Sequence, residues 1–286
     1  MDDPLSQRLF GYYNGRYLPT EDIRLPVYDL LILRGLGVFD YLRTYHRVPF
    51  LLDDHLERFF RSADEMEIAH GISPDHLRDV IYHLAAISPL PESAFRLLLT
   101  PGMGDHSLMP GHPSLVVLTE AIHPFPAQWY QTGIAAKTIS FDRYRPLAKS
   151  VMYSQAVLEL ALARQEGFQE VIYKTGEYLT EGTTCNLFFI RENELITPSN
   201  LVLHGTRRRF VMNLAGDCGF SVLERPVSIH ELSSFQECFI TSTTREILPV
   251  CSIDHQTIGS GKPGPVTRML HQTYTARVMK ESGTPS

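Results

Sequence analysis

A lysine flanked by small and apolar residues is the group in this sequence that most directly suggests covalent chemistry. Lys149 stands in the segment Arg145-Pro-Leu-Ala-Lys149-Ser-Val-Met-Tyr153, just ahead of an expected amphipathic helix that ends near Gly167. A lysine removed from solvent has a lowered pKa and can act as an amine nucleophile, as Schiff-base chemistry requires. Taken alone, the segment favours an ordinary surface lysine whose methylene groups cover apolar neighbours. The segments downstream reverse that balance.

Composition and charge exclude several other kinds of protein. With 286 residues and 43% hydrophobic content, the chain can bury a substantial core and is expected to form two domains. A net charge of -6 argues against sequence-independent nucleic-acid binding. Glu159 and Arg164 interrupt the longest apolar helix, so no membrane span is expected, and the acidic N-terminus lacks the apolar core of a secretory signal. We therefore expect a soluble cytoplasmic protein.

Cysteines and histidines give no metal or redox pattern. Cys185, Cys218, Cys238 and Cys251 stand at wide, irregular intervals without a Cys-x-x-Cys pair, and we interpret them as buried thiols. The 12 histidines are scattered, and none forms a His-Glu-x-x-His spacing. No metal site is expected.

Residues 1–122 are expected to form a small α+β domain, because strands and helices segregate along this part of the chain. Asn14-Gly15 between two aromatic runs predicts a hairpin. Residues 33–45 predict a strand in which Gly35 and Gly37 leave room for a group to approach the backbone. The remaining expected elements are a strand at 48–52 that pairs back on it, a helix at 54–66 capped by Asp53 or Asp54 with Leu56, Phe59, Phe60 and Ala63 in the core, a helix from Ser73-Pro74 to about 87, and strands at 94–100 and 114–119.

Residues 123–128 contain Pro124 and Pro126 and are expected to link this domain to a larger one at 129–286. In the larger part we expect strands at 133–139, 170–173, 184–190, 194–197, 220–224, 238–241 and 247–253, and helices at 154–167, 206–217, 228–233 and 265–280. The helix after Lys149 is expected to bury Ala156, Val157, Leu160, Ala161 and Ala163.

Several separated segments resemble the class IV aminotransferases, in that family's order. Leu179-Thr-Glu181-Gly-Thr-Thr-Cys-Asn186 is similar to the family's Thr-Glu-Gly-x-x-x-Asn signature. The other similar segments are Asn14-Gly15, 34–40, 55–58, the two phosphate-binding segments 203–208 and 239–250, and the closing motif 261–268. The resemblance covers nearly the whole chain. It implies fold type IV, with a small N-terminal α/β domain, a larger domain with a β-barrel-like core, and a homodimer.

The resemblance implies pyridoxal 5'-phosphate as the cofactor, with Lys149 as the residue that holds it and moves protons. Glu181 is expected beside the pyridine nitrogen, which it keeps protonated. Tyr153 is expected at the ring hydroxyl, with a core tyrosine as the alternative.

The cofactor phosphate is expected to meet Arg58 as a charge clamp, for which an ion pair on an exposed helix face is the alternative. Thr206 and Arg207, at a helix start, are expected to give backbone donors, and Ser242 and Thr243 hydroxyl or backbone donors. The family commonly has Gly-Ile-Thr-Arg where this chain has Gly205-Thr-Arg-Arg208.

Arg34 and Arg96 are the candidate residues for binding the substrate carboxylate, with purely structural roles as the alternative. The loop at Gly104-Asp105-His106 lacks the Arg-x-His of common D-amino-acid enzymes, whereas Ala94-Phe95-Arg96 is similar to a strand of branched-chain enzymes. Residues 34–40 resemble a less common set of D-amino-acid aminotransferases. We therefore expect a D-amino-acid aminotransferase that passes the amino group to a keto acid such as 2-oxoglutarate. The alternatives are a branched-chain L-amino-acid aminotransferase, an aminodeoxychorismate lyase and a non-catalytic scaffold.

Overall fold

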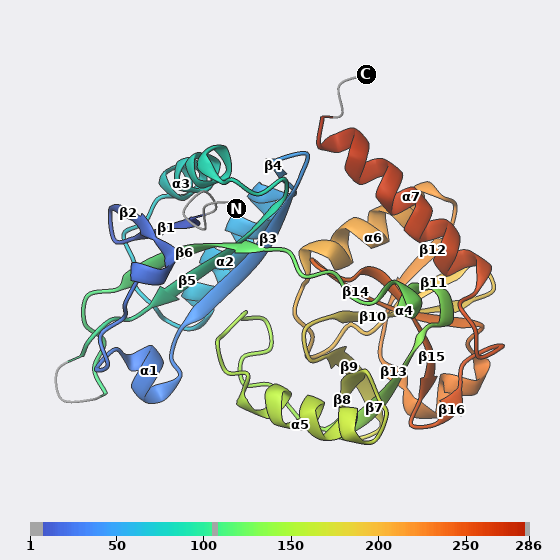
Figure 1. Cartoon of the computed structure of the whole chain (residues 1–286). Helices are drawn as coiled ribbons and strands as arrows, with labels where there is room; N and C mark the ends of the chain where they lie inside the picture. The colour runs from blue at the N-terminus through green and yellow to red at the C-terminus, as the bar shows by residue number, and fades with distance from the viewer. Residues whose placement is uncertain (1–7, 105–107, 284–286) are drawn as a thin grey trace. The chain divides into compact units, whose positions relative to one another are not determined.

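The computed structural model describes residues 8–104 and 108–283, and their contacts divide them into two compact units (Figure 1). Unit 1 takes the described residues up to His123 together with Ala148–Met152 and those from Val278 onward. Unit 2 is Pro124–Leu147 and Tyr153–Arg277. The domain boundaries expected from the sequence stay a prediction, because a division of contacts does not test which parts fold alone.

Unit 1 is built on an antiparallel sheet of six strands in the order β2-β1-β6-β5-β3-β4. One core joins this sheet to helices α2 and α3. The bounds are β1 Phe10–Tyr13, β2 Arg16–Pro19, the 3-10 helix η2 Thr20–Asp22, α1 Leu30–Arg34, β3 Val38–Tyr45, β4 Val48–Pro49, α2 Leu52–Glu65, α3 Pro74–Ile87, β5 Ser93–Thr100 and β6 Ser114–Ala121. The Asn14-Gly15 hairpin and the helix from Pro74 to Ile87 are confirmed.

The prediction of one strand over 33–45 is wrong at its start. Asp29 caps α1 by accepting a hydrogen bond from the Leu31 N–H at 2.9 Å, and Gly35 ends the helix in a left-handed conformation with φ 66°. The expected close approach to the backbone is confirmed at Gly37, where a Cβ would lie 2.8 Å from Leu31 Cδ1, whereas nothing lies within 4 Å of a Cβ on Gly35. The strand therefore begins at Val38.

Helix α2 begins earlier than expected, at Leu52, after a two-residue strand β4. Its N-cap residue is Leu51, with φ 54° and no side-chain cap, so the expected cap at Asp53 or Asp54 is wrong. Both aspartates lie in the first turn instead, where negative charge is favourable to the helix dipole. Phe60 is half-buried, while Leu56, Phe59 and Ala63 are buried as expected.

Unit 2 contains a closed ring of strands in the order β10-β14-β15-β7-β8-β9, and β9 pairs back to β10. The ring closes through one register pair, Glu181 with Asn186. The strands are β7 Ile134–Ser140, β8 Glu170–Thr175, β9 Tyr178–Gly182, β10 Asn186–Arg191, β11 Glu194–Thr197, β12 Ser221–Glu224, β13 Val227–Ser228, β14 Glu237–Ser242, β15 Glu246–Ile253 and β16 Gln256–Thr257. The β-barrel-like core implied by the resemblance is confirmed, whereas β9, β13 and β16 were not predicted.

The helices of unit 2 are α4 Ala127–Thr132, α5 Ser154–Gln165, α6 Thr206–Asp217, the 3-10 helix η4 Ile229–Ser234 and α7 Pro265–Glu281, whose last residues belong to unit 1. Ala156 and Ala163 of α5 are buried as expected, but Val157 is 65% exposed and Ala161 is exposed too. The expected core face of α5 is wrong at these two positions.

The cysteines are only partly buried thiols: Cys185 and Cys238 are buried, Cys251 is half-buried and Cys218 is exposed. Across residues 8–104 and 108–283, no helix is long and apolar enough to cross a membrane.

Candidate active site

The backbone of Lys149 is held by unit 1. Its N–H donates to Ser62 Oγ of α2 at 3.0 Å, and its carbonyl accepts from the Phe39 N–H of β3 at 2.9 Å. The neighbouring Ala148 is fully buried in the unit 1 core. The Lys149 side chain is half-buried, and its Nζ lies 4.4 Å from the centre of the Phe39 ring. This segment is an anchored loop with a fixed backbone, not a free surface turn.

Arg58 lies in a buried charged cluster with Asp40 and His55. Asp40 accepts hydrogen bonds from Arg58 Nε and Nη2, both at 2.8 Å, and from His55 Nδ1 at 2.6 Å. Burial alone would raise the pKa of Asp40, but the charges of Arg58 and His55 hold it well below its usual range. The alternative expectation, an ion pair on an exposed helix face, is wrong, because Arg58 is 5% exposed and its partner Asp40 is fully buried. The expected role of Arg58 at a phosphate stays a prediction.

Ser62 connects this cluster to Lys149. Its hydroxyl donates to the Arg58 carbonyl at 2.7 Å and accepts from the Lys149 N–H. Two of the predicted site residues, Lys149 and Arg58, are therefore joined within unit 1 through one serine.

Glu181 lies on β9 in unit 2 and is 4% exposed. One carboxylate oxygen accepts a hydrogen bond from Arg143 Nη1, and the other accepts from the Leu203 N–H at 3.0 Å and Asn186 Nδ2 at 3.4 Å. Burial alone would lower the pKa of Arg143, but the Glu181 charge more than offsets this, so the pKa is raised. Glu181 is thus a buried carboxylate with a guanidinium counter-charge.

The start of α6 lies close to Glu181 because Asn186 bridges the two segments. Asn186 Nδ2 donates to the Leu203 carbonyl at 2.9 Å as well as to Glu181. A Cβ on Gly205, the N-cap residue, would lie 2.2 Å from Asn186 Oδ1, so only glycine fits there. Thr206 and Arg207 follow in the first turn and are 4% and 2% exposed. The helix start therefore presents backbone N–H groups inside a tightly packed segment.

Ser242 ends β14, and Thr243 follows in the turn before β15. Ser242 Oγ accepts from the Arg245 N–H at 3.2 Å, and Arg245 in turn pairs with Glu170 at 2.8 Å. Tyr153 directly precedes α5 and packs against the cluster that contains Tyr173. Burial and the nearby Tyr153 raise the pKa of Tyr173.

The two arginines expected at the substrate carboxylate differ in their surroundings. Arg34, the last residue of α1, is exposed, and its Nη1 donates to the Leu33 carbonyl at 2.8 Å. Arg96 on β5 makes two hydrogen bonds to the Glu120 carboxylate, at 2.6 and 3.0 Å, so it already holds an internal carboxylate. Asp105 and His106, on which the comparison with D-amino-acid enzymes depended, lie outside the described residues.

The predicted residues of each unit have the chemical groups that pyridoxal 5'-phosphate would require. Unit 2 supplies a buried acid for a ring nitrogen, and a helix start and a serine hydroxyl for a phosphate. Unit 1 supplies an anchored lysine and a buried arginine. No group of three or more His, Cys, Asp or Glu side chains in the described ranges could hold a metal ion.

Sequence reasoning missed Asp40, Arg143 and Arg245, which contact predicted residues, and Glu170, which pairs with Arg245. Asp40 carried a signal, because it ends the segment 34–40 that resembles the family. Arg245 also lies in a similar segment, 239–250, whereas Arg143 carried no signal, since its partner Glu181 is 38 residues away.

Known proteins are similar to this chain over most of its length. The Amino-transferase class IV family model matches residues 37–253. A Methanocaldococcus jannaschii protein with the provisional name "branched-chain-amino-acid aminotransferase" is 32% identical over 274 residues, covering 92% of this chain and 94% of the relative. The Bacillus licheniformis D-alanine aminotransferase is 30% identical over 275 residues, covering 94% of this chain and 97% of the relative.

Solved structures of branched-chain amino acid aminotransferases are also similar. That of Escherichia coli has a TM-score of 0.87 at 27% identity and covers 97% of each chain. A second such enzyme, solved with pyridoxamine 5'-phosphate, has a TM-score of 0.89 at 26% identity, covering 97% of this chain and 96% of the other. The family match spans most of the sequence, and the chain therefore belongs to the class IV aminotransferases, transaminases of fold type IV that use pyridoxal 5'-phosphate.

Proposed function

We propose that this transaminase moves an amino group between a D-amino acid and a keto acid such as 2-oxoglutarate, with pyridoxal 5'-phosphate held on Lys149. The observation that carries the cofactor assignment is the buried Glu181, which has Arg143 as counter-charge and Asn186 as its link to α6. A carboxylate of this kind suits a protonated pyridine nitrogen. When bound, the cofactor supplies the electron sink that the transfer needs.

The other residues have separate tasks in this proposal. Lys149 holds the cofactor covalently and moves the proton at the substrate α-carbon. Arg58, the first-turn N–H groups of Thr206 and Arg207, and Ser242 and Thr243 bind the phosphate. Tyr153 donates to the ring hydroxyl. The Lys149 group and the Glu181 group belong to different units, and the family relationship is what supports their joint action.

Borohydride reduction followed by peptide mapping tests the lysine. We expect the label on the peptide that contains Lys149, and a Lys149→Ala variant that is not labelled. Lys137→Ala is the control, because Lys137 pairs with Glu166 at 2.6 Å near the surface and should keep full labelling. A label on another side chain, or on none, contradicts the assignment.

The preference for D-amino acids rests on Arg34 and on relatives named D-alanine aminotransferase. Arg34 is exposed at the end of α1, where it is available to a carboxylate. The test is a half-reaction screen with D- and L-alanine, leucine and glutamate, following the visible absorbance of the bound cofactor. We expect a response to D-acids only, and Arg34→Gln should raise the substrate concentration required. Arg24→Gln, another exposed arginine that donates to a neighbouring carbonyl, should have no effect.

The second candidate is a branched-chain L-amino-acid aminotransferase. The Methanocaldococcus relative and the similar solved structures favour it, as does Arg96 on its strand. A response only to L-leucine in the same screen would select it over the D-amino-acid proposal. An aminodeoxychorismate lyase would form 4-aminobenzoate without any keto acid, so a requirement for 2-oxoglutarate separates both transaminases from it.

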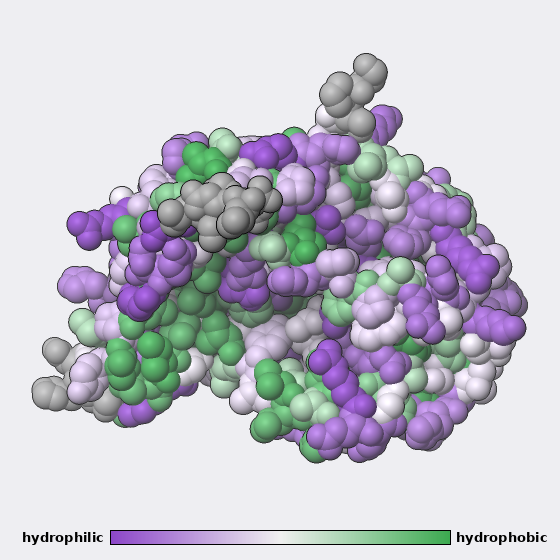
Figure 2. Space-filling model, viewed as in Figure 1, coloured by the Kyte–Doolittle hydropathy of each residue, from purple (hydrophilic) through white to green (hydrophobic). Residues whose placement is uncertain are grey.

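We also propose a cytoplasmic homodimer. Exposed apolar side chains support the dimer: Val157, Leu158 and Leu162 of α5 are 65%, 63% and 52% exposed, and Figure 2 shows an apolar patch over the start of α5. Light scattering during gel filtration should give twice the chain mass, and Leu158→Asp should lower it toward the monomer. A monomeric wild-type protein would contradict the dimer without affecting the proposed chemistry.

A further inference from the structure

A buried ion pair in unit 2 has no task in the proposed chemistry. Glu170, at the start of β8, is fully buried, and Arg245, in the turn before β15, is 6% exposed. Glu170 Oε2 accepts from Arg245 Nη2 at 2.8 Å. A buried ion pair is weak evidence for stability, because apolar side chains of similar size often replace it without loss. The other contacts of Glu170 and of Arg245 indicate that the pair positions neighbouring residues.

The Glu170 side holds the turn that follows Glu181. Glu170 Oε1 accepts from the Thr183 N–H at 3.1 Å and from Thr183 Oγ1 at 2.6 Å. A Cβ on Gly182 would lie 2.4 Å from Cys185 Sγ and 3.5 Å from this carboxylate, so the turn is packed directly against it. The position of Arg245 is thereby tied to the segment that carries Glu181.

The Arg245 side holds the hydroxyl of Ser242. Arg245 Nη1 donates to Thr184 Oγ1 at 2.7 Å and, at the longer distance of 3.5 Å, to Ser242 Oγ. The Arg245 backbone N–H donates to the same Ser242 oxygen at 3.2 Å. A serine hydroxyl has two acceptor sites and one proton. When both acceptor sites face N–H groups, the proton is left to donate elsewhere.

We propose that Arg245 and Glu170 are positioning residues that make Ser242 a hydrogen-bond donor toward a phosphate monoester. The proposal rests on the proposed function, in which Ser242 binds the cofactor phosphate. The Arg245 donors occupy the acceptor sites of Ser242, and Glu170 keeps the guanidinium in place. Ser242 then meets the phosphate oxygens with its proton and not with a repelling lone pair.

The test compares two ligands that share a ring and an aldehyde but differ in the phosphate. Full-length cofactor-free protein is titrated with pyridoxal 5'-phosphate and with pyridoxal. For Arg245→Met we expect the affinity for pyridoxal 5'-phosphate to fall about tenfold to hundredfold, as for the loss of one hydrogen bond to a charged group. The affinity for pyridoxal should stay unchanged.

Two further variants separate positioning from packing. Ser242→Ala should show the same selective loss, and the double variant with Arg245→Met should lose no more than either single one, because the two residues act through one hydroxyl. Glu170→Gln keeps the size and the acceptor for Thr183, and should show a smaller loss in the same direction. It also carries the test if Arg245→Met does not fold, as judged by circular dichroism.

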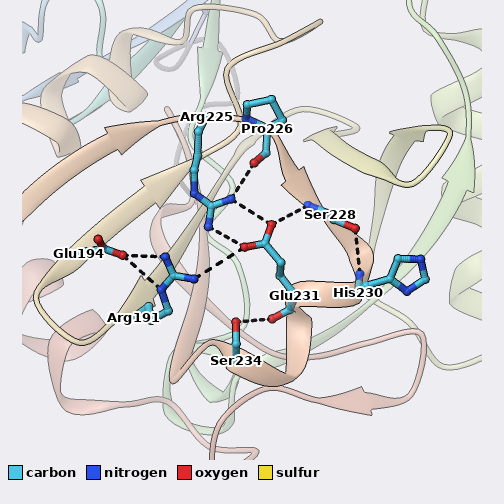
Figure 3. A network of polar contacts seen from close by, with 8 residues as sticks. All are labelled: Arg191, Glu194, Arg225, Pro226, Ser228, His230, Glu231 and Ser234. Atoms are coloured by element: carbon cyan, nitrogen blue, oxygen red, sulfur yellow. Dashed lines mark hydrogen bonds and ion pairs between the residues drawn. The ribbon is translucent and has the colours of Figure 1, made fainter.

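The matched control is another arginine of unit 2. Arg225 makes two hydrogen bonds to Glu231, at 3.0 and 2.7 Å, in a network with Arg191 and Glu194 (Figure 3). Arg225→Met also removes an arginine–glutamate pair, here one that is partly exposed, and should leave both affinities unchanged. Figure 3 shows this guanidinium also facing the Pro226 carbonyl, so its contacts are with its own neighbourhood.

The outcomes distinguish a failure of the proposed function from a failure of the role of Arg245. If wild-type protein binds neither ligand, the proposed function fails. If wild-type protein binds pyridoxal 5'-phosphate but Arg245→Met weakens both ligands equally, or neither, the role of Arg245 is overturned while the proposed function stands.

Discussion

Replacing Asp40 by asparagine tests the charged cluster under Arg58 and Lys149. The carboxylate is fully buried and accepts four hydrogen bonds, from Arg58 Nε, Arg58 Nη2, His55 Nδ1 and the Tyr41 N–H. Asparagine keeps one acceptor oxygen but removes the charge, which leaves a buried guanidinium without its counter-ion. Breaking a buried pair in this way costs about 3–5 kcal/mol of the free energy of unfolding.

The loss should depend on pH in a defined direction. The pKa of Asp40 is lower in the folded chain than its ordinary value of 3.8, so the ionised form favours folding. Its contribution is fully present above that value and is lost as the pH falls through and below it. The stability difference between wild type and Asp40→Asn should therefore be large at neutral pH and should shrink toward acid pH.

The assay is urea unfolding of the cofactor-free protein, followed by circular dichroism at neutral and acid pH. Asp53→Asn is the control, since Asp53 also pairs with an arginine, Arg78 at 2.8 Å, but is 80% exposed. We expect no measurable change for it. A loss for Asp40→Asn below about 1 kcal/mol, the size expected of a surface pair, or a loss equal at both pH values, would refute the reasoning.

Two more predictions concern the glycine at the start of α6 and the thiols. Gly205→Ala should destabilise the chain by more than about 1 kcal/mol in urea unfolding, because its Cβ would lie 2.2 Å from Asn186 Oδ1. Gly216→Ala in the same helix, with nothing within 4 Å of the new Cβ, should instead stabilise it by about 0.5–1 kcal/mol. In native protein a disulfide reagent should react fast with the exposed Cys218 and slowly with Cys251, because burial raises the pKa of Cys251 to about 11. Cys218→Ser should remove the fast phase, and a fast phase that survives this change would contradict the assignment.

The parts of the fold that could be predicted have local signals. Asn14-Gly15 marks a hairpin, and Ser73 with Pro74 marks a helix start, whatever packs around them. The predictions were wrong where burial of a residue depends on which other elements pack against it. The apolar residues of α5 follow a helical spacing, but the spacing does not say how wide a face the sheet covers, and Val157 is left exposed.

In the candidate site, too, residues with a signal in the nearby sequence were predicted, and residues without one were missed. Glu181 was predicted from a motif of neighbouring residues, and Lys149 from its place in a series of segments that resemble one family. Residues that hold them were missed because they come from elsewhere in the chain: Arg143 is 38 residues from Glu181, and Ser62 is 87 residues from Lys149. A sequence pattern specifies which groups react, whereas the groups that orient them depend on the topology.

The strand ring of unit 2 is closed by the junction of β9 with β10. The two residues paired there, Glu181 and Asn186, both belong to the Thr-Glu-Gly-x-x-x-Asn segment. Every other junction in the ring is a ladder of several register pairs, but β9 and β10 share one register pair, Glu181 with Asn186, next to a hydrogen bond from the Gly182 N–H to the Cys185 carbonyl at 2.8 Å. Local opening of a protein begins where backbone pairing is thinnest. We therefore expect a substitution at either residue to loosen the barrel at this junction. If a variant at Glu181 or Asn186 is inactive, local opening of the barrel should be measured before the loss of activity is attributed to catalysis.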